Sequence, residues 1–251
     1  MRLLAARSRL AALGVRCILA LLATATMHQQ RASAQTAVDL HLVLAVDASG
    51  SVSMRRFELQ KKGYVAAFRD PKVLRAIRTG EQQAIAVTMH QWTGPAMQVQ
   101  VIPWMLVRDE ATIGALADAI DRAPRQLFGG GTSISGAIDY SMELFPRSPF
   151  RASRRVIDVS GDGANNRGRP AALARDEAVA AGVTINGLPI LEVEPGVDEF
   201  YKNNVIGGPN AFMIPANTFE EFADAILRKL VLEIAGDRRL PLRVRADLLE
   251  R

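Results

Sequence analysis

Short apolar runs alternate with amphipathic stretches along the chain after Gln35, and this alternation constrains the fold more than any other feature. Apolar runs of strand length predict strands at 40–46, 84–91, 97–105, 155–159, 184–189 and 211–214. Apolar residues at helical spacing predict helices at 54–68, 110–122, 133–144, 170–181, 197–203 and 218–234. Strands that alternate with helices favour a parallel sheet covered by crossover helices.

One connection departs from this pattern. The segment "WTGPA" between the second and third expected strands is too short for a crossover helix, so these two strands should pair antiparallel. We therefore predict an α/β fold with a doubly wound, Rossmann-like and mostly parallel six-stranded sheet, one antiparallel edge strand, and helices on both faces. In the last helix, Thr218 and Glu221 have the spacing of a capping box.

The first 34 residues have the pattern of a secretory signal peptide. Arginines precede the apolar run 17–25, and Ala32-Ser33-Ala34 offers a small-residue cleavage site before Gln35. The apolar run holds about nine residues, whereas a membrane span needs about 20, so a membrane anchor is the weaker interpretation. We expect a mature chain that starts at Gln35, has no membrane span, and is exported to the periplasm or the extracellular space.

Removal of the signal peptide changes the charge of the chain. The net charge of the full sequence is +5, but residues 1–34 contain five arginines and no acidic residue. The mature chain is therefore close to neutral, and nucleic acid is not expected as a partner. The single cysteine, Cys17, is removed too, which excludes internal disulfides and cysteine-ligated zinc. The domain is expected to cover residues 38–236, followed by a basic tail at 237–251.

Three segments rich in glycine, hydroxyl and carboxylate groups are expected at one edge of the sheet. "DASGS" follows the first strand and contains Asp47, Ser49 and Ser51. "GGGTS" precedes a helix and contains Thr132, and "DVSGDG" ends a strand and contains Asp162. In a doubly wound sheet, ligands bind beyond the carboxyl ends of the strands, where such loops converge. The three segments should therefore lie together.

Two carboxylates and three hydroxyls form a set of hard oxygen donors. Such donors suit Mg²⁺, Mn²⁺ or Ca²⁺ and do not suit zinc or copper. Because only the two carboxylates are charged, a bound divalent ion keeps part of its charge unbalanced and retains water at some positions. The set therefore favours a divalent-metal site with an open position.

The combination of DxSxS, then Thr, then Asp resembles the metal-ion-dependent adhesion site (MIDAS) of von Willebrand factor type A (vWA) domains, whose fold is the one predicted above. Longer segments such as "FELQKKGYVAAFRDPKVLRAI" and "GGGTSISGAIDYSMELF" look like an exported bacterial vWA family of unassigned function. This resemblance covers nearly the whole mature chain. It implies that Ser49 and Ser51 bind the ion directly, Thr132 directly or through water, and Asp47 and Asp162 largely through water.

An ion held mainly by neutral hydroxyls remains a strong electrophile, so we expect a protein partner to complete it with an Asp or Glu carboxylate. The chain is thus expected to be a binding module and not an enzyme. The ligand-binding face is expected to comprise Gly50, Gly130, Gly131, Gly163, Asn165, Asn166 and Arg167.

Two other functions stay open. In a metal-assisted phosphoester hydrolase, Asp47 and Asp162 near Mg²⁺ would orient a water molecule, although hydroxyl ligands activate water poorly and no general base is evident. The histidines of the mature chain, His41 and His90, fall within expected strands. A vWA domain with a purely structural ion would need a closed coordination shell, whereas this donor set leaves a position open.

Overall fold

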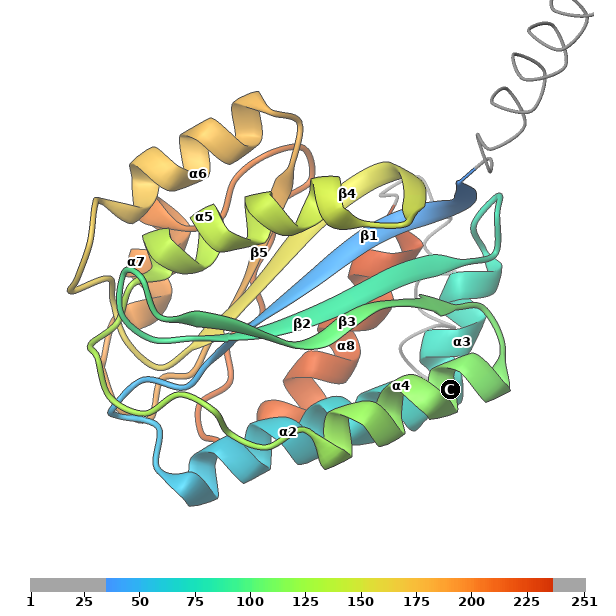
Figure 1. Cartoon of the computed structure of the whole chain (residues 1–251). Helices are drawn as coiled ribbons and strands as arrows, with labels where there is room; N and C mark the ends of the chain where they lie inside the picture. The colour runs from blue at the N-terminus through green and yellow to red at the C-terminus, as the bar shows by residue number, and fades with distance from the viewer. Residues whose placement is uncertain (1–34, 237–251) are drawn as a thin grey trace, which may run out of the picture. The chain divides into compact units, whose positions relative to one another are not determined.

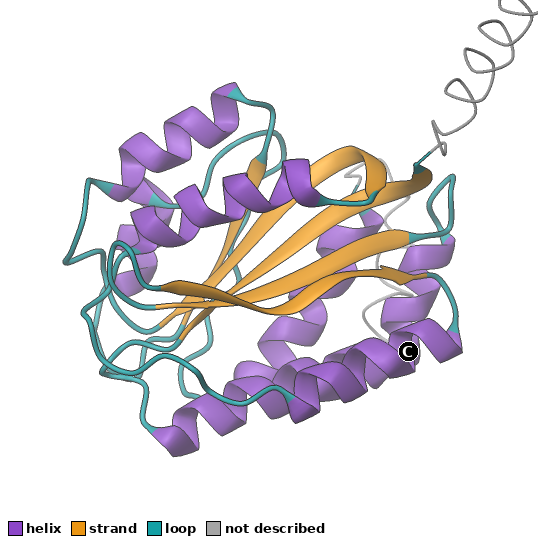
Figure 2. Ribbon diagram, in the orientation of Figure 1, coloured by secondary structure: helices purple, strands orange, loops and turns teal. Residues whose placement is uncertain are grey.

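The computed structural model describes residues 35–236, so the expected signal peptide (1–34) and basic tail (237–251) lie outside the described residues. One sheet of five strands runs through the described part of the chain (Figures 1 and 2). In spatial order the strands are β3 (Gln98–Val107), β2 (Ile85–Trp92), β1 (Thr36–Asp47), β4 (Phe150–Gly161) and β5 (Thr184–Pro189).

The sheet is mostly parallel, as predicted. β1 pairs parallel with β2 and β4, and β5 pairs parallel with β4, whereas β2 and β3 are antiparallel. The "WTGPA" segment closes the hairpin between β2 and β3, where the N–H of Thr93 donates to the carbonyl of Met97 at 3.0 Å. This confirms one antiparallel edge strand. β1 lies in the middle of the sheet and packs apolar residues on both faces, which explains its unbroken apolar run.

The predicted sixth strand at 211–214 is wrong. This segment makes a single bridge to β5, in which Met213 pairs with Gly187, and just beyond it Ala216 pairs with Ile190. A continuous parallel ladder between these bridges would need an N–H from Pro189, and proline has none. The described residues therefore form a sheet with five strands instead of six.

Helices cover both faces of the sheet, as predicted (Figure 1). One face packs against α2 (Met54–Arg69), α3 (Pro71–Arg78), α4 (Glu110–Arg122) and α8 (Phe222–Ala235). The other face packs against α5 (Ile134–Leu144), α6 (Ala171–Ala180) and α7 (Val197–Asn204), and a short 3-10 helix (Phe145–Arg147) follows α5. Within residues 35–236, no helix combines the length and apolar character needed to cross a membrane.

Two helices differ from the sequence prediction. α3 was not predicted, and it starts afresh after Asp70 because the following Pro71 disfavours helical backbone at the preceding residue. α8 starts at Phe222 instead of Thr218. Thr218 Oγ1 accepts from the N–H of Glu221 at 3.3 Å, but the Glu221 carboxylate accepts from the N–H of Asn217 at 3.1 Å. Only half of the capping box forms, and residues 218–221 make a turn.

Candidate metal centre

The two predicted carboxylates meet at the carboxyl edge of the sheet. Asp47 is the last residue of β1, and Asp162 directly follows the last residue of β4. The two strands are parallel neighbours, so these residues come together although they are 115 positions apart in sequence. Both side chains are fully buried, and the N–H of Asp162 lies 3.4 Å from Asp47 Oδ2, to which it donates.

Ser49 and Ser51 direct their hydroxyls to the same place. Their Oγ atoms are 3.2 Å apart, and the Ser51 hydroxyl donates to Asp162 Oδ1 at 2.6 Å. Asp47 Oδ1 accepts from the N–H of Ser49 at 2.7 Å, which fixes the turn after β1. Ser49 is buried and Ser51 is exposed, so the group opens to solvent on the side of Ser51 and Gly50.

Thr132 enters from the loop before α5 and lies beside Gly163. A Cβ at Gly163 would be 3.9 Å from Thr132 Oγ1. The main chain of Thr132 is held on both sides, because its N–H donates to Asn166 Oδ1 at 2.9 Å and its carbonyl accepts from the N–H groups of Asn166 and Arg167. The structure thus brings the five predicted ligands together from three adjacent loops.

The glycines before Thr132 have a conformational role. Gly129, Gly130 and Gly131 have φ angles of +71°, +90° and +83°, in the left-handed region that residues with a Cβ resist. The hairpin between β2 and β3 also packs closely on this run, because a Cβ at Gly130 would lie 2.7 Å from Met97 Sδ. The three glycines therefore let the loop turn sharply under the hairpin.

The residues predicted for the ligand-binding face have mixed positions. Asn165 Oδ1 accepts from the N–H of Ser135 at 3.0 Å, so the amides of both Asn165 and Asn166 bind the chain's own loops. The side chain of Arg167 is exposed and packs over Gly131. Gly50 and Gly130 are exposed, Gly131 is half-buried and Gly163 is buried.

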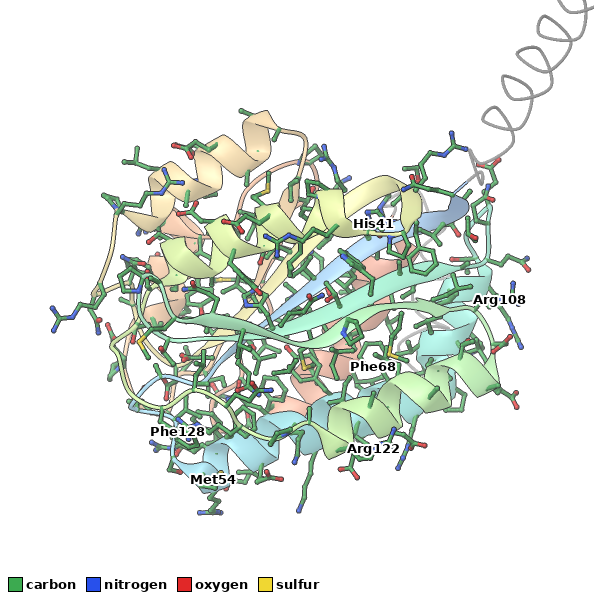
Figure 3. All side chains as sticks on the ribbon, viewed as in Figure 1. His41, Met54, Phe68, Arg108, Arg122 and Phe128 are labelled. Atoms are coloured by element: carbon green, nitrogen blue, oxygen red, sulfur yellow. The ribbon has the colours of Figure 1, made fainter. Side chains whose placement is uncertain are left out.

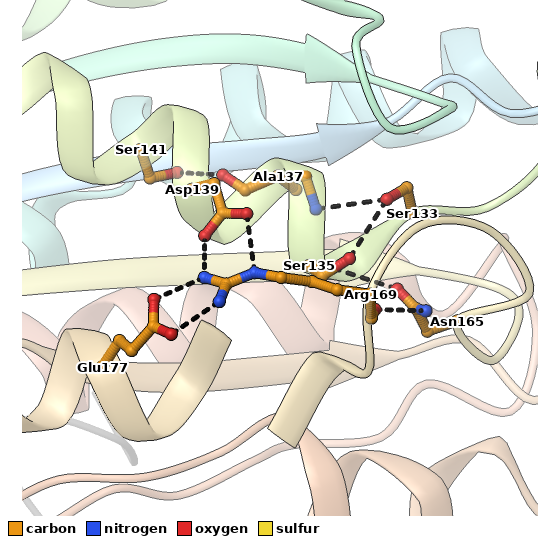
Figure 4. A network of polar contacts seen from close by, with 9 residues as sticks. Ser133, Ser135, Ala137, Asp139, Ser141, Asn165, Arg169 and Glu177 are labelled. Carbon is orange, nitrogen blue, oxygen red and sulfur yellow. Dashed lines mark hydrogen bonds and ion pairs between the residues drawn. The ribbon is translucent and has the colours of Figure 1, made fainter. Parts of the chain in front are cut away.

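An ion-pair network connects the loop after β4, which carries Asn165 and Asn166, to helices α5 and α6 (Figure 4). The Arg169 guanidinium binds Asp139 on α5, with Nη2 to Oδ1 at 2.5 Å, and Glu177 on α6, with Nη1 to Oε1 at 2.6 Å. Asn165 Nδ2 donates to the carbonyl of Arg169 at 3.1 Å. The loop that carries the asparagines is therefore fixed to two helices, and through Asn166 it positions Thr132.

Sequence reasoning missed Arg125, which binds the loop after β1. Its guanidinium donates to the carbonyls of Ala48, Ser49 and Val52 at 2.8, 3.1 and 2.7 Å, and its Nε donates to the carbonyl of Leu127 at 2.9 Å. It joins the loop of the serine ligands to the segment before the glycine run. No sequence signal could have identified it, because main-chain carbonyls at four positions leave no pattern of residue types.

Burial dominates the electrostatics of the centre. It raises the pKa of Asp47 to about 7, and the nearby Asp162 raises it further, while the N–H of Ser49 opposes the shift. Burial also raises the pKa of Asp162, against the hydrogen bond from Ser51. Asp162 Oδ2 is buried and has no hydrogen-bond partner among the described residues. Two adjacent buried carboxylates with an unpaired oxygen fit a cation.

The donor set also restricts what the centre can bind. Within residues 35–236, no three His, Cys, Asp or Glu side chains are grouped so that they could share an ion. The donors at this centre are two carboxylates and neighbouring hydroxyl oxygens. His41 and His90 are buried in strands, where each contacts a serine hydroxyl through Nε2, Ser148 at 3.0 Å and Ser141 at 2.8 Å. The residues present fit a hard divalent cation such as Mg²⁺, Mn²⁺ or Ca²⁺.

The chain matches one protein-family model and no curated protein. The family described as "Protein of unknown function (DUF1194)" matches residues 37–238. A search of the curated proteins finds no match.

Several solved structures share the fold. The structure described as "von Willebrand factor type A from Catenulispora acidiphila" has a TM-score of 0.55 and 20% identity, over 79% of this chain and 43% of that one. Proximal thread matrix protein 1 from the mussel byssus, with a zinc-occupied MIDAS motif, has a TM-score of 0.56 and 16% identity, over 78% of this chain and 46% of that one. The pilus adhesin SpaC from Lactobacillus rhamnosus GG has a TM-score of 0.53 and 14% identity, over 79% and 31%.

These likenesses show the fold, which is that of a vWA domain. The chain spans less than half the length of each of these structures.

Proposed function

The chain belongs to the family described as "Protein of unknown function (DUF1194)" and has a vWA fold. We propose that it is an exported binding module. In this proposal the chain binds an acidic group of a protein partner through a divalent metal ion. One observation carries the proposal. The hydroxyls of Ser49 and Ser51 meet the buried, partly unpaired carboxylate of Asp162 at the carboxyl edge of the sheet.

In this proposal Ser49, Ser51 and Thr132 hold the ion, and Asp47 and Asp162 lie behind them. The hydrogen bond from the Ser51 hydroxyl to Asp162 supports this arrangement. In it the hydroxyl contacts the ion and the carboxylate contacts the hydroxyl. Mg²⁺ is the proposed ion, with Mn²⁺ or Ca²⁺ as alternatives. The zinc-occupied MIDAS of the mussel protein supports a divalent ion in general at such a site. When bound, the ion supplies a positive charge that neutral hydroxyls leave unbalanced.

The partner is proposed to supply an Asp or Glu carboxylate. Ser51 and Gly50 are exposed, so a second molecule can reach the centre from their side. A carboxylate oxygen completes both the charge and the coordination of a divalent ion. This opening argues against a purely structural ion, which needs a closed shell.

Calorimetric titration with Mg²⁺ and with Mn²⁺ tests the metal site. We expect one ion per chain with modest affinity, and no binding to a folded Asp47→Ala and Asp162→Ala double variant. The matched control is Asp118→Ala with Asp121→Ala, which removes the same charge from the exposed surface of α4. Undiminished binding to the first double variant would refute the ligand assignment.

The partner is tested by crosslinking, followed by binding measurements in Mg²⁺ and in EDTA. Changing the partner's acidic residue to its amide should abolish binding in Mg²⁺. Full binding in EDTA, or no loss with the amide, is incompatible with recognition through a metal.

Export is tested separately. Intact-mass analysis of the chain recovered from the periplasm or medium should give a protein that starts at Gln35. Recovery with residues 1–34 still attached contradicts the proposed cleavage.

A further inference from the structure

Large exposed apolar side chains lie at the same edge of the sheet as the candidate metal centre. Five such side chains are well exposed among the described residues. Four of them lie at the carboxyl edge of the sheet, Met54 at the start of α2 and the other three on loops: Met54, Met97, Phe128 and Val193, with exposed fractions of 54%, 38%, 59% and 37%. The fifth, Leu173, is 52% exposed and lies on α6. We call the first four residues the apolar rim.

Two members of the apolar rim are directly linked to the predicted ligands in sequence. Met54 follows Ser51 by three positions, and Phe128 precedes the glycine run that leads to Thr132. Figure 3 shows both Met54 and Phe128 at the end of the molecule where the loops after the strands gather. The two loops touch, because a Cβ at Gly50 would lie 3.7 Å from the Cα of Gly129.

The other two members come from neighbouring loops. Met97 lies at the hairpin between β2 and β3, in contact with Gly130. Val193 follows β5 and is fixed by the glutamates on either side of it. Glu192 Oε1 binds Arg56 Nη2 at 2.7 Å, and Glu194 Oε2 accepts from the N–H of Ala164 at 2.9 Å.

Phe128 is exposed but held in place. The guanidinium carbon of Arg125 lies 4.8 Å from the centre of its ring, and the donors of Arg125 are bound to the carbonyls of the loop after β1. An aromatic ring that is presented to water in a fixed position loses little freedom when a partner covers it. Such rings are typical anchors of protein interfaces.

Resting on the proposed function, we infer that the apolar rim contacts the partner around the metal, and that the partner is a protein segment presenting one carboxylate flanked by apolar side chains. The ion at the centre complements the carboxylate, and the rim complements the apolar flanks. A carboxylate on a purely polar surface would leave the rim exposed to water. A lipid surface fits less well, because the same edge also exposes the polar Ser51, whose hydroxyl binds the carboxylate of Asp162.

Two labelled peptides test the inference by fluorescence anisotropy. In one, a central Asp is flanked on each side by Leu, and in the other by Ser. In Mg²⁺ we expect the Leu-flanked peptide to bind at least about tenfold more tightly, since an apolar anchor contributes that much at an interface. Both peptides should lose binding in EDTA.

Variants of the chain locate the preference. Phe128→Ser and Met54→Ser should each remove most of the preference for Leu flanks, without changing metal binding by calorimetry. Leu173→Ser is the matched control, because Leu173 is as exposed as Met54 but lies outside the apolar rim, and it should keep the preference.

The outcomes separate this inference from the function on which it rests. Equal binding of both peptides in Mg²⁺, lost in EDTA, overturns the inference and leaves metal-bridged recognition standing. Binding of neither peptide in Mg²⁺, or a Leu preference that persists in EDTA, overturns both. Binding of the chain to phosphatidylcholine and phosphatidylglycerol vesicles that is lost in Phe128→Ser would assign the rim to a lipid surface instead.

Discussion

Gly161 leaves space for the carboxylate of Asp47 and two buried aromatic side chains. It is the last residue of β4, and a Cβ there would lie 2.9 Å from Asp47 Oδ2, 2.9 Å from the Tyr201 hydroxyl and 3.1 Å from Trp92 Cζ2. All three neighbours are fully buried, so none of them can move aside into solvent. Only a residue without a side chain leaves room for all three groups at this position.

We expect Gly161→Ala to displace Asp47, to weaken Mg²⁺ binding at least tenfold by calorimetry, and to lower the free energy of unfolding by about 1–3 kcal/mol. Gly114→Ala is the control, because Gly114 lies within α4 and a Cβ there meets nothing within 4 Å. That change should raise the free energy of unfolding by about 1 kcal/mol. Wild-type metal affinity in Gly161→Ala would contradict the packing argument.

His90 gives the fold a defined pH dependence. Burial lowers its pKa from 6.5 to about 4, so the folded chain holds it neutral. As pH falls below 6.5 the unfolded chain takes up this proton first, and the free energy of unfolding should fall between about pH 6.5 and 4. His41, which Figure 3 labels, has the same burial-driven shift to about 4.

Urea denaturation at a series of pH values checks this prediction. His90→Gln removes the titrating group and keeps an amide that can bind Ser141, so the variant should lose less stability than the wild type between pH 6.5 and 4. Asp47 acts in the opposite direction, because a folded pKa of about 7 makes stability fall as pH rises from about 4 to 7. Asp47 contributes equally to wild type and variant, so its contribution cancels when their free energies of unfolding are subtracted. An equal loss of stability between pH 6.5 and 4 in both proteins would contradict the role of His90.

The residue types in the sequence predicted which residues form the centre, but not the hydrogen bonds that the residues around it make. The spacing of Asp47, Ser49 and Ser51 identified a group that the structure does bring together with Asp162, and their role as ligands remains a prediction. Asn166 was predicted for the binding face, which stays a prediction; its side chain is exposed, and its Oδ1 also accepts from the N–H of Thr132. An amide can bind outward or bind its own loop, and a single sequence does not distinguish the two.

A buried ion cluster anchors the last helix to the sheet. Lys229 Nζ on α8 lies 2.5 Å from Asp158 Oδ1 on β4, and it also binds the carboxylate of Glu233 one turn further along the helix. Asn186 Nδ2 on β5 donates to Glu233 Oε1 at 2.9 Å. Lys229 and Asp158 are fully buried and Glu233 is nearly so. Burial raises the pKa of Glu233 to about 7, and Asp158 adds to the shift.

We expect Lys229→Met to lower the free energy of unfolding by about 3–5 kcal/mol, because it leaves two acidic side chains buried without a cation. Adding Asp158→Asn and Glu233→Gln should recover much of this loss in chemical denaturation. Lys202→Met on α7 is the control, since its ion pair with Glu199 is exposed, and it should change stability by less than about 1 kcal/mol. A neutral effect of Lys229→Met would show that α8 does not depend on the cluster.

Periodicity predicted most helices and strands but not those that depend on one proline. α3 exists as a separate helix because Pro71 follows Asp70, and the strand at 211–214 fails because Pro189 cannot donate to it. The Asp158–Lys229–Glu233 cluster was not predicted either. The sequence alone does not show which charged residues of different core elements form ion pairs, because this depends on how the elements pack.

The order of the strands explains why one edge of the domain carries the candidate metal centre. β1 lies between β2 and β4, and its connection passes to α2 on one face, whereas the connection from β4 passes to α6 on the other. At such a switch point the loops diverge and leave a crevice between neighbouring strand ends. The alternation of elements predicted this arrangement, which places Asp47 and Asp162 together.

Metal binding at this edge should stabilise the entire domain, because an ion held by three separate loops has no comparable site in the unfolded chain. Mg²⁺ at one hundred times its dissociation constant should add about 2.7 kcal/mol to the free energy of unfolding. For a domain of this size the melting temperature should rise by roughly 5–10 °C.

Scanning calorimetry in Mg²⁺, in EDTA, and in NaCl of equal ionic strength measures the effect. Ser51→Ala should lose most of the rise, measured against the same variant in EDTA, because the loss of its hydrogen bond to Asp162 also changes the melting temperature of the metal-free chain. An equal rise in NaCl, or in the Asp47→Ala and Asp162→Ala variant, would mean that the stabilisation does not come from an ion at this centre.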